Sequence, residues 1–354
     1  MSTDYKFEGW IAYNKDSAKG NLQWGTYEPK PFLDTDIDIA VTHCGVRGSD
    51  LSHLKSSWKP ADYPLVVGHE IVGHAVRVGK NVKSIKIGDR VGVGAQSLSC
   101  LECDRCIHDQ EQHCNKSVIT YDARYADGSK ANGGYAKYWR GSSEFVFQIP
   151  DKLPSEVAAP LLCAGITTYT PLKENGAGPD KRVGVIGIGG LGSFGILLAK
   201  ALKADKVVAI SRTSSKREDA IKMGADSFIA TAEETDYATK YDSTLDLIIC
   251  TVSGPNLPIA DYISLLDVNG TFIQLGAPED PIPSFSAFSL LRKNIKLGGS
   301  LIGSRKNIKE ALQLAADSNL AAWVNVRPMS EANQVVVDMA NGKARYRYVL
   351  KNDV

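Results

Sequence analysis

The sequence predicts an α/β protein of two domains, one rich in short β-strands and one built on a doubly wound parallel sheet. The length of 354 residues exceeds one ordinary core and fits two domains of roughly 100 to 200 residues each. Gly, Pro, Asn or Asp interrupts residues 6–150 at short intervals, whereas strand-like and helix-like segments alternate after residue 158. We therefore expect the domains at 1–158 and 159–299, with residues 300–354 returning to the first.

Individual elements follow from the apolar runs between these breaks. In the first domain, strands are expected at 37–42, 71–78 and 90–93. The second domain reads in βαβ order, which implies a parallel sheet with helices on both faces. Its strands are expected at 182–188, 206–210, 245–250 and 270–275, and its helices at 192–202 and 216–223.

Composition excludes several classes of function. A hydrophobic fraction of 43%, a charged fraction of 23% and a net charge of +1 indicate a soluble globular protein without the basic excess that nucleic acid requires. The N-terminal segment has no apolar core of a signal peptide, and no stretch approaches the ~18 apolar residues of a membrane span. We expect a cytoplasmic protein with a small-molecule substrate and neither nucleic acid nor membrane as a partner.

The strand at 182–188 runs into a glycine-rich turn and then into a helical run. This order is typical of a dinucleotide-binding Rossmann unit, because glycines permit a tight turn and close approach of the pyrophosphate to the helix N-terminus. A tight turn without a ligand is the alternative. The cofactor-binding residues expected here are Gly187, Gly189, Gly190, Leu191 and Gly192.

The residues after the second strand of this unit favour NADPH over NADH. An NAD binder places an acidic residue there, about 20 residues after the glycines, for the ribose 2′-hydroxyl. This sequence has Ser211, Arg212 and Lys216 instead. A hydroxyl and cations can hold a 2′-phosphate through charge-assisted hydrogen bonds. The alternative is that both cations are solvated surface charges.

Four of the seven cysteines fall within residues 100–114. In a chain without a signal peptide, this crowding indicates a metal rather than disulfides. Four thiolates close a tetrahedral zinc site with no open position, which is structural rather than catalytic. The expected ligands are Cys100, Cys103, Cys106 and Cys114.

These motifs together resemble the zinc-dependent medium-chain dehydrogenase/reductase family, in its cinnamyl alcohol dehydrogenase branch, over nearly the whole chain. The resemblance implies a GroES-like β-rich catalytic domain, a Rossmann domain and a cleft between them, with Thr167 near the nicotinamide and Arg345 at the pyrophosphate. Besides the cysteine segment and the glycine turn, it rests on Gly68-His69-Glu70, Gly88-Asp89-Arg90-Val91, Gly133-Gly134-Tyr135-Ala136, Cys163-Ala164-Gly165-Ile166-Thr167 and Arg345-Tyr346-Arg347.

One ligand position departs from the family. Relatives of this branch bind a catalytic zinc through a cysteine of the motif C-G-V-C-G/H-S/T-D, the histidine of G-H-E and the cysteine of C-A-G-x-T. The resemblance places the second and third ligands at His69 and Cys163, with Glu70 as the neighbouring carboxylate, and it places the first at Arg47. Cys44 matches the other cysteine of that motif, which is not a ligand.

A second departure lies nearby. Where relatives carry a histidine that relays a proton to solvent, this chain has Ser52, with His53 one position further on. Ser49 matches the hydroxyl step of the relay and is present.

Arg47 changes the chemistry that we expect. Arginine cannot ligate a metal, and its fixed charge repels one. The catalytic zinc is therefore expected to be absent unless Cys44 or Glu70 completes the metal shell. Without a metal, the guanidinium is free to pair with Glu70 or to hydrogen-bond a substrate carbonyl or carboxylate.

Alcohol oxidation would suffer without zinc, because zinc makes a bound alcohol acidic. Reduction of an activated C=C bond of an α,β-unsaturated carbonyl, or of an iminium C=N bond, needs only a hydride and a proton donor. We predict an NADPH-dependent reductase of this kind, with a place in specialised metabolism. The alternatives are a zinc-dependent alcohol dehydrogenase or aldehyde reductase with a completed metal shell, and a non-redox cyclase, isomerase or binding protein. Candidate proton donors are Ser49, Ser52, His53, Tyr121 and Tyr125, and packing alone is the favoured alternative for the two tyrosines.

The apolar run 296–303 matches a segment that forms an edge strand across a two-fold axis in relatives. An unpaired edge of this kind favours aggregation. A homodimer is therefore expected.

Overall fold

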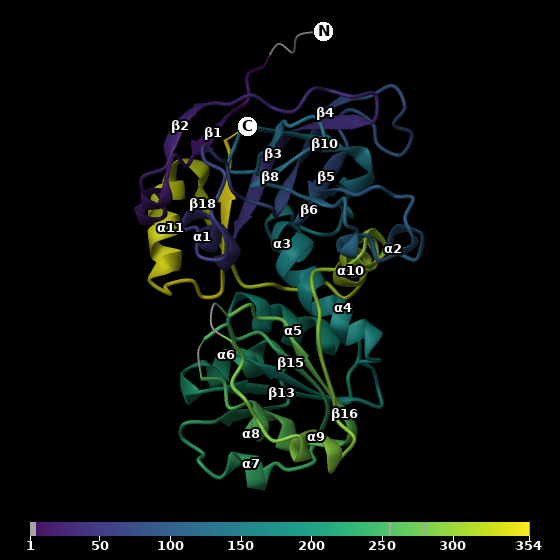
Figure 1. Ribbon diagram of the computed structural model, residues 1–354, viewed down its shortest axis with the longest axis vertical. Coiled ribbons are helices and arrows are strands. Elements are labelled where there is room, and N and C mark those ends of the chain that lie inside the picture. The colour runs from purple at the N-terminus through teal and green to yellow at the C-terminus, as the bar shows by residue number, and fades with distance from the viewer. Residues whose placement is uncertain (1–4, 255, 279–280, 354) are drawn as a thin grey trace. The chain divides into compact units, whose positions relative to one another are not determined.

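The computed structural model describes residues 5–353 except 255 and 279–280. The chain divides into two compact units (Figure 1). Unit 1 comprises Met1–Cys163, Gly303–Asn319 and Trp323–Val354, and unit 2 comprises Ala164–Ile302 and Leu320–Ala322.

A seven-stranded sheet organises unit 1 around its longest strand, β3 (Asp36–Val46). One side of β3 pairs with β4 (Ile71–Val78). The other side pairs first with β10 (Tyr138–Ser142) and then with β19 (Arg347–Lys351). The last strand of the chain therefore lies beside the end of β3 that leads into Arg47. The sheet is completed by β5 (Arg90–Val93), β11 (Phe147–Gln148) and β18 (Val324–Pro328).

Smaller elements surround this sheet and confirm the β-rich character predicted for residues 6–150. Three two-stranded sheets are formed by β1 (Glu8–Ile11) and β2 (Gln23–Thr26), β6 (Gln96–Leu98) and β7 (Val118–Ile119), and β8 (Ala123–Arg124) and β9 (Lys130–Ala131). The helices are α1 (Gly48–Leu54), α2 (Asp104–Ile107), α3 (Ser155–Pro160), α10 (Arg305–Asp317) and α11 (Ala332–Ala340), and the short turns are η1 (Lys15–Lys19), η2 (Glu111–His113), η3 (Ser143–Phe145), the π-helical η4 (Leu161–Gly165) and η6 (Met329–Glu331).

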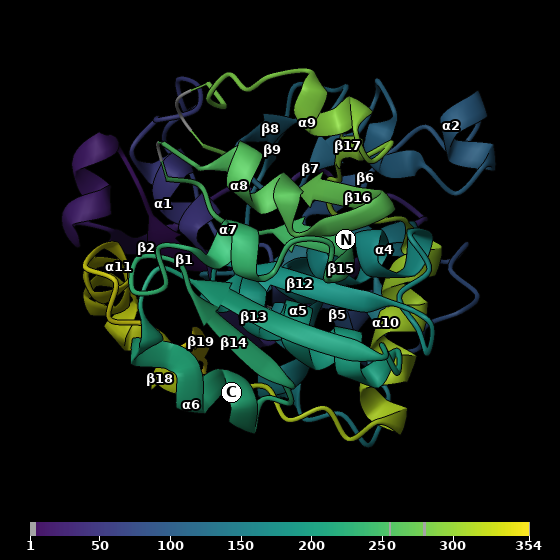
Figure 2. The same cartoon turned by 90° about the horizontal axis from the view of Figure 1, so that it is seen from below.

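The predicted doubly wound parallel sheet of unit 2 is confirmed. Its strands lie in the order β14-β13-β12-β15-β16-β17, and each pair of neighbours is parallel (Figure 2). The chain starts at the central strand β12, extends the sheet to one side and then crosses to the other. The bounds are β12 (Arg182–Ile186), β13 (Lys206–Ser211), β14 (Ser227–Ala230), β15 (Leu245–Cys250), β16 (Leu266–Gln274) and β17 (Lys296–Gly299).

Some boundaries in unit 2 differ from the prediction. The helix expected at 216–223 is divided into η5 (Ser214–Lys216) and α6 (Arg217–Lys222), and the strand expected at 270–275 begins earlier, at Leu266. Strand β14 was not predicted, because a run of four residues gives little periodicity to detect. The other helices are α4 (Ile166–Glu174), α5 (Gly190–Ala201), α7 (Tyr237–Lys240), α8 (Ile259–Ser264) and α9 (Phe288–Leu291).

Strand β17 lies at one edge of this sheet, as the resemblance predicted for this segment, and its four residues are exposed. The homodimer that we inferred from this edge remains a prediction.

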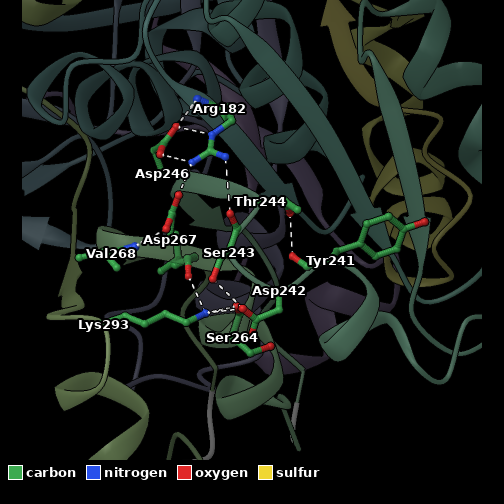
Figure 3. A network of polar contacts seen from close by, with 11 residues as sticks. Arg182, Tyr241, Asp242, Ser243, Thr244, Asp246, Ser264, Asp267, Val268 and Lys293 are labelled. Carbon is green, nitrogen blue, oxygen red and sulfur yellow. Dashed lines mark hydrogen bonds and ion pairs between the residues drawn. The ribbon is translucent and has the colours of Figure 1, made fainter.

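A network of charged side chains ties together the amino ends of the parallel strands (Figure 3). Arg182, the first residue of β12, donates from Nε to Asp246 of β15 and from Nη2 to Asp267 of β16, both over 2.9 Å. Lys293 donates to Asp242 over 3.0 Å. The carboxyl ends of the same strands are left for the glycine turn and its ligand.

The helix α10 is the longest in the described part of the chain, at 13 residues. Ser304 caps it by accepting a hydrogen bond from the Asn307 N–H over 3.1 Å. About 20 apolar residues are needed to cross a bilayer as a helix. Within the described ranges, no helix meets that requirement of length and apolar character.

Candidate active site

The four cysteines predicted to hold zinc come together in unit 1. Their sulfur atoms are separated by 3.5 Å for Cys103 and Cys106 and for Cys100 and Cys114, and by 3.8 Å for two other pairs. A tetrahedron with Zn–S bonds of about 2.3 Å has edges of about 3.8 Å, so the cluster fits a zinc ion. Within the described residues, this is the one group of at least three potential metal-ligating side chains placed for a single ion.

Backbone N–H groups lower the pKa of one thiol in this cluster. The N–H groups of Glu102 and Cys103 hydrogen-bond to the Cys100 sulfur and lower the pKa of its thiol to about 6. Because zinc binds thiolates, a thiol that is already acidic is a suitable ligand.

The glycine turn of unit 2 has the shape that a pyrophosphate site requires. Gly187 has a φ of +86°, and a Cβ on Gly192 would lie 1.9 Å from the Gly187 carbonyl oxygen. A Cβ on Gly189 would meet nothing within 4 Å, so the backbone is open at that point. Helix α5 begins at Gly190 with no side-chain cap, which leaves its N–H groups for an anion. Leu191 follows in the first turn of α5.

The residues predicted to recognise a 2′-phosphate follow β13. Since Ile186 and Ile210 are aligned in parallel strands, the glycine turn and Ser211 lie at the same edge of the sheet. Arg212 is exposed, whereas Lys216 donates from Nζ to the Ile188 carbonyl over 2.6 Å. Lys216 is therefore tied to the glycine turn, which the sequence did not indicate.

Two further cofactor-binding residues that the resemblance predicts lie far from the glycine turn in the sequence. Thr167 is buried in helix α4 of unit 2. Arg345 is exposed in unit 1, with its guanidinium carbon 6.0 Å from the centroid of the Tyr346 ring.

Arg47, His69 and Cys163 converge in unit 1 from three segments. Arg47 follows directly after β3, His69 precedes β4, and Cys163 lies in η4. The turn at Gly68 has a φ of +100°, and a Cβ there would lie 2.5 Å from the Tyr135 ring. Only glycine suits that turn, which delivers His69 to the group.

The guanidinium of Arg47 contacts the sulfur of Cys163 through Nη1. Burial raises the pKa of Cys163 to about 11, although Arg47 opposes that rise, so the thiol is protonated at neutral pH. Burial alone would lower the pKa of Arg47, but Cys163 and Glu70 raise it, and the guanidinium stays charged. A cation therefore contacts Cys163 at the position that the resemblance assigns to a zinc-binding cysteine, and of that ligand set the chain keeps His69 and Cys163.

Pairing with Glu70 was one of the two roles considered for Arg47, and within the described residues no ion pair joins these two side chains. Glu70 instead forms a buried ion pair with Arg347, from Nη2 to Oε2. Strand β19 brings Arg347 beside the end of β3, and the carboxylate lies over Gly45, where a Cβ would be 1.9 Å from Glu70 Oε2. The family motif contained Arg347, but its role depends on the pairing of distant strands.

An aromatic ring fixes the plane of His69, and within the described residues its Nε2 makes no hydrogen bond. His69 stacks on Tyr121 with ring centroids 5.2 Å apart and an interplanar angle of 9°. Burial lowers the pKa of His69, and the charge of Arg47 lowers it further, so the ring is neutral at pH 7. Tyr121 donates to Asp50 over 2.7 Å, and Tyr135 donates to the same carboxylate over 3.3 Å.

The candidates for proton transfer on α1 have different surroundings. Ser49 Oγ is buried and has no hydrogen bond of ordinary geometry within the described residues. Ser52 donates to the Gly48 carbonyl over 3.3 Å, which directs its hydroxyl back along the helix. His53 Nδ1 lies 2.6 Å from Asp122 Oδ2, a partner that the sequence did not indicate.

Tyr125, a candidate proton donor, and Cys44, a candidate substitute zinc ligand, are both packed among other side chains. Tyr125 donates to Ser97 over 3.3 Å and packs in a small apolar cluster with Val118 and Ala131. Cys44 lies in the core of unit 1, and a Cβ on Gly68 would meet its sulfur at 2.7 Å. These contacts direct both side chains into packing.

Comparison with known proteins agrees with this architecture. Residues 34–151 match the alcohol dehydrogenase GroES-like domain, and residues 190–317 match the zinc-binding dehydrogenase family. NADP-dependent alcohol dehydrogenase 6 of Saccharomyces cerevisiae is 45% identical over 99% of this chain and 98% of its own length. Cinnamyl alcohol dehydrogenase 2 of Arabidopsis thaliana is 40% identical over 99% of this chain and 92% of its own length.

A solved cinnamyl alcohol dehydrogenase from Sorghum bicolor superimposes with a TM-score of 0.92 at 33% identity, covering 98% of both chains. Sequence and structure therefore agree over both units. This chain is an oxidoreductase that belongs to the zinc-type medium-chain dehydrogenase/reductase family.

Proposed function

We propose that this chain is an NADPH-dependent reductase that works without a catalytic zinc and reduces an activated C=C or C=N bond of a small molecule. The observation that carries the proposal is the contact of the Arg47 guanidinium with Cys163, because it puts a permanent cation where relatives place a zinc-binding cysteine.

The choice of cofactor rests on unit 2. The glycine turn offers open backbone and free helix N–H groups, and Ser211 and Arg212 stand where an NAD binder has a carboxylate. The yeast relative is NADP-dependent by name, which supports the same choice. Bound NADPH would supply the hydride.

The surroundings of Arg47 favour reduction over alcohol oxidation. An alcohol must lose a proton before it gives up hydride, and a guanidinium stabilises an alkoxide without generating it as zinc does. Glu70, which would complete a metal shell, is paired with Arg347, and Cys44 is packed in the core. An electrophilic double bond needs no such activation.

Metal analysis of the purified chain tests the proposal. We expect one zinc per chain, held by the four-cysteine cluster, together with NADPH oxidation on a panel of enals, enones and imines. Two zinc ions per chain would indicate the zinc-dependent alcohol dehydrogenase instead. The variant Arg47→Cys should raise the zinc content by about one equivalent, and the matched variant Arg47→Ser, which adds no ligand thiol, should not.

A further inference from the structure

Most N–H groups of the Arg47 guanidinium make no hydrogen bond within the described residues. It carries five N–H groups, and within the described residues its side chain makes one hydrogen bond, from Nη1 to the Cys163 sulfur, which is a weak acceptor. The residue as a whole is partly exposed. A charged group that is largely removed from water and bonded to a thiol alone is costly unless a ligand completes its shell.

The neighbouring carboxylates have other partners. Glu70 accepts from Arg347. Asp50 accepts from the Tyr121 and Tyr135 hydroxyls and from the backbone N–H of Arg47, the last over 2.7 Å. Within the described residues, the guanidinium of Arg47 is therefore a cation without a carboxylate in contact.

A second polar atom near Arg47 also lacks a partner. His69 is 9% exposed, and its Nε2 has no hydrogen bond within the described part of the chain. The parallel stack on Tyr121 fixes the plane of the ring, so the orphaned nitrogen has a defined direction. Unpaired buried polar atoms are rare in folded proteins and point to a group that is absent from the free protein.

We propose that Arg47, assisted by the Nε2–H tautomer of His69, binds the carbonyl oxygen of the substrate, and that the substrate is an α,β-unsaturated aldehyde or ketone rather than an iminium ion. This inference rests on the proposed reductase function. Bound NADPH would supply the hydride for the β-carbon. The C=C electron pair would then move toward the carbonyl, and Arg47 would stabilise the enolate oxygen that forms. The α-carbon then takes a proton from water, giving the saturated carbonyl and NADP⁺.

The same charge discriminates against the other activated substrate class. An iminium ion is already cationic, and hydride transfer neutralises it, so no negative charge develops for Arg47 to stabilise. A fixed guanidinium also repels the ground state of such a substrate. An enal or enone is neutral and gains negative charge at the atom nearest the donors.

Two substrates of similar size test this difference. For cinnamaldehyde, we expect 3-phenylpropanal as the product, with a kcat/KM at least about 100-fold above that for the N-methyl-3,4-dihydroisoquinolinium cation. Arg47→Met should lower kcat/KM for cinnamaldehyde by about 10² to 10³-fold, the usual effect of removing one oxyanion donor, and should leave or raise that for the cation. Arg77→Met is the matched control, because Arg77 stacks on Phe32 at 3.6 Å in a different part of the sheet.

Binding provides a readout that does not depend on turnover. Cinnamate carries a carboxylate and cannot be reduced by hydride, and calorimetry should show its Kd rising at least about 10-fold in Arg47→Met but not in Arg77→Met. If Arg47→Met fails to fold, Arg47→Lys, which keeps the charge but loses the fork, should still weaken both the cinnamaldehyde reaction and cinnamate binding.

The outcomes separate the two proposals. Equal reduction of both substrates, or an equal loss of both in Arg47→Met, would overturn the role of Arg47 while the reductase function stands. Arg47-dependent binding of cinnamate without NADPH oxidation on either substrate would overturn the reductase function while the oxygen-binding site stands.

Discussion

The four-cysteine cluster and the group of side chains around Arg47 lie in the same unit, but their residues come from different parts of the chain. The cluster takes all its sulfur atoms from residues 100–114, and their separations fit one zinc ion. The group around Arg47 consists of side chains from separate strands and turns, namely Arg47, His69, Cys163 and Arg347. The ligands of the cluster therefore follow from spacing along the chain, whereas the neighbours of Arg47 depend on the pairing of distant strands.

The largest effect is expected from breaking the cluster. Cys103→Ser removes one of four ligands, so the zinc content should fall by about one equivalent per chain and the Tm by roughly 10 °C or more, because metal binding contributes to folding. Metal analysis and calorimetry measure both. Cys44→Ser, a buried thiol outside the cluster, should keep its zinc. Retention of zinc by Cys103→Ser would show that the cluster tolerates loss of a ligand.

A smaller effect is expected from breaking the buried ion pair near Arg47. Arg347→Met removes the buried cation beside Glu70, and the free energy of unfolding should fall by about 3–5 kcal/mol. Arg124→Met, which breaks an exposed ion pair with Asp62, should cost less than about 1 kcal/mol. Denaturant unfolding compares the two variants. Similar losses would mean that burial of the Glu70 pair has no special cost.

The smallest effect is expected on the pH dependence of stability, through the contact of Asp122 with His53 of helix α1. Burial alone would raise the pKa of Asp122, but hydrogen bonds from His53 and from the Asp62 N–H lower it below its usual value. The folded protein therefore binds fewer protons than the unfolded chain, and this stabilisation is present above about pH 4 and is lost as pH falls toward the folded pKa.

Asp122→Asn should accordingly lose stability at neutral pH and show a shallower decline of the unfolding free energy between about pH 5 and pH 3. Denaturant unfolding across that range measures the slope. Asp34→Asn, which alters an exposed carboxylate paired with Lys80, is the control. An unchanged slope in Asp122→Asn would assign the acid sensitivity to other carboxylates.

The glycine turn and the cysteine cluster were readable from sequence because each is a local pattern. The glycines directly follow β12, and the backbone geometry at Gly187 and Gly192 requires the absence of a side chain. Likewise, four thiols at short spacing have few ways to satisfy one another except around a metal. The β-rich character of unit 1 and the parallel sheet of unit 2 followed from the same kind of local evidence.

The contacts of the charged side chains could not be predicted from the sequence. The sequence offered Glu70 as one of two possible partners of Arg47, and β19 brings Arg347 to that carboxylate. Asp122 reaches His53 across 69 positions, and Lys216 reaches the Ile188 carbonyl across the sheet edge. None of these contacts leaves a periodicity or spacing in the chain.

The sequence by itself determined the fold class, the glycine turn, the four-thiol cluster and the presence of an arginine at a ligand position, because each depends on residues close in the chain. Only the tertiary structure decided which groups that arginine meets. Strand pairing over hundreds of residues assigns Glu70 to Arg347 and leaves Arg47 in contact with Cys163. Buried charged groups pair with the groups that lie closest in space, and the fold determines which groups those are.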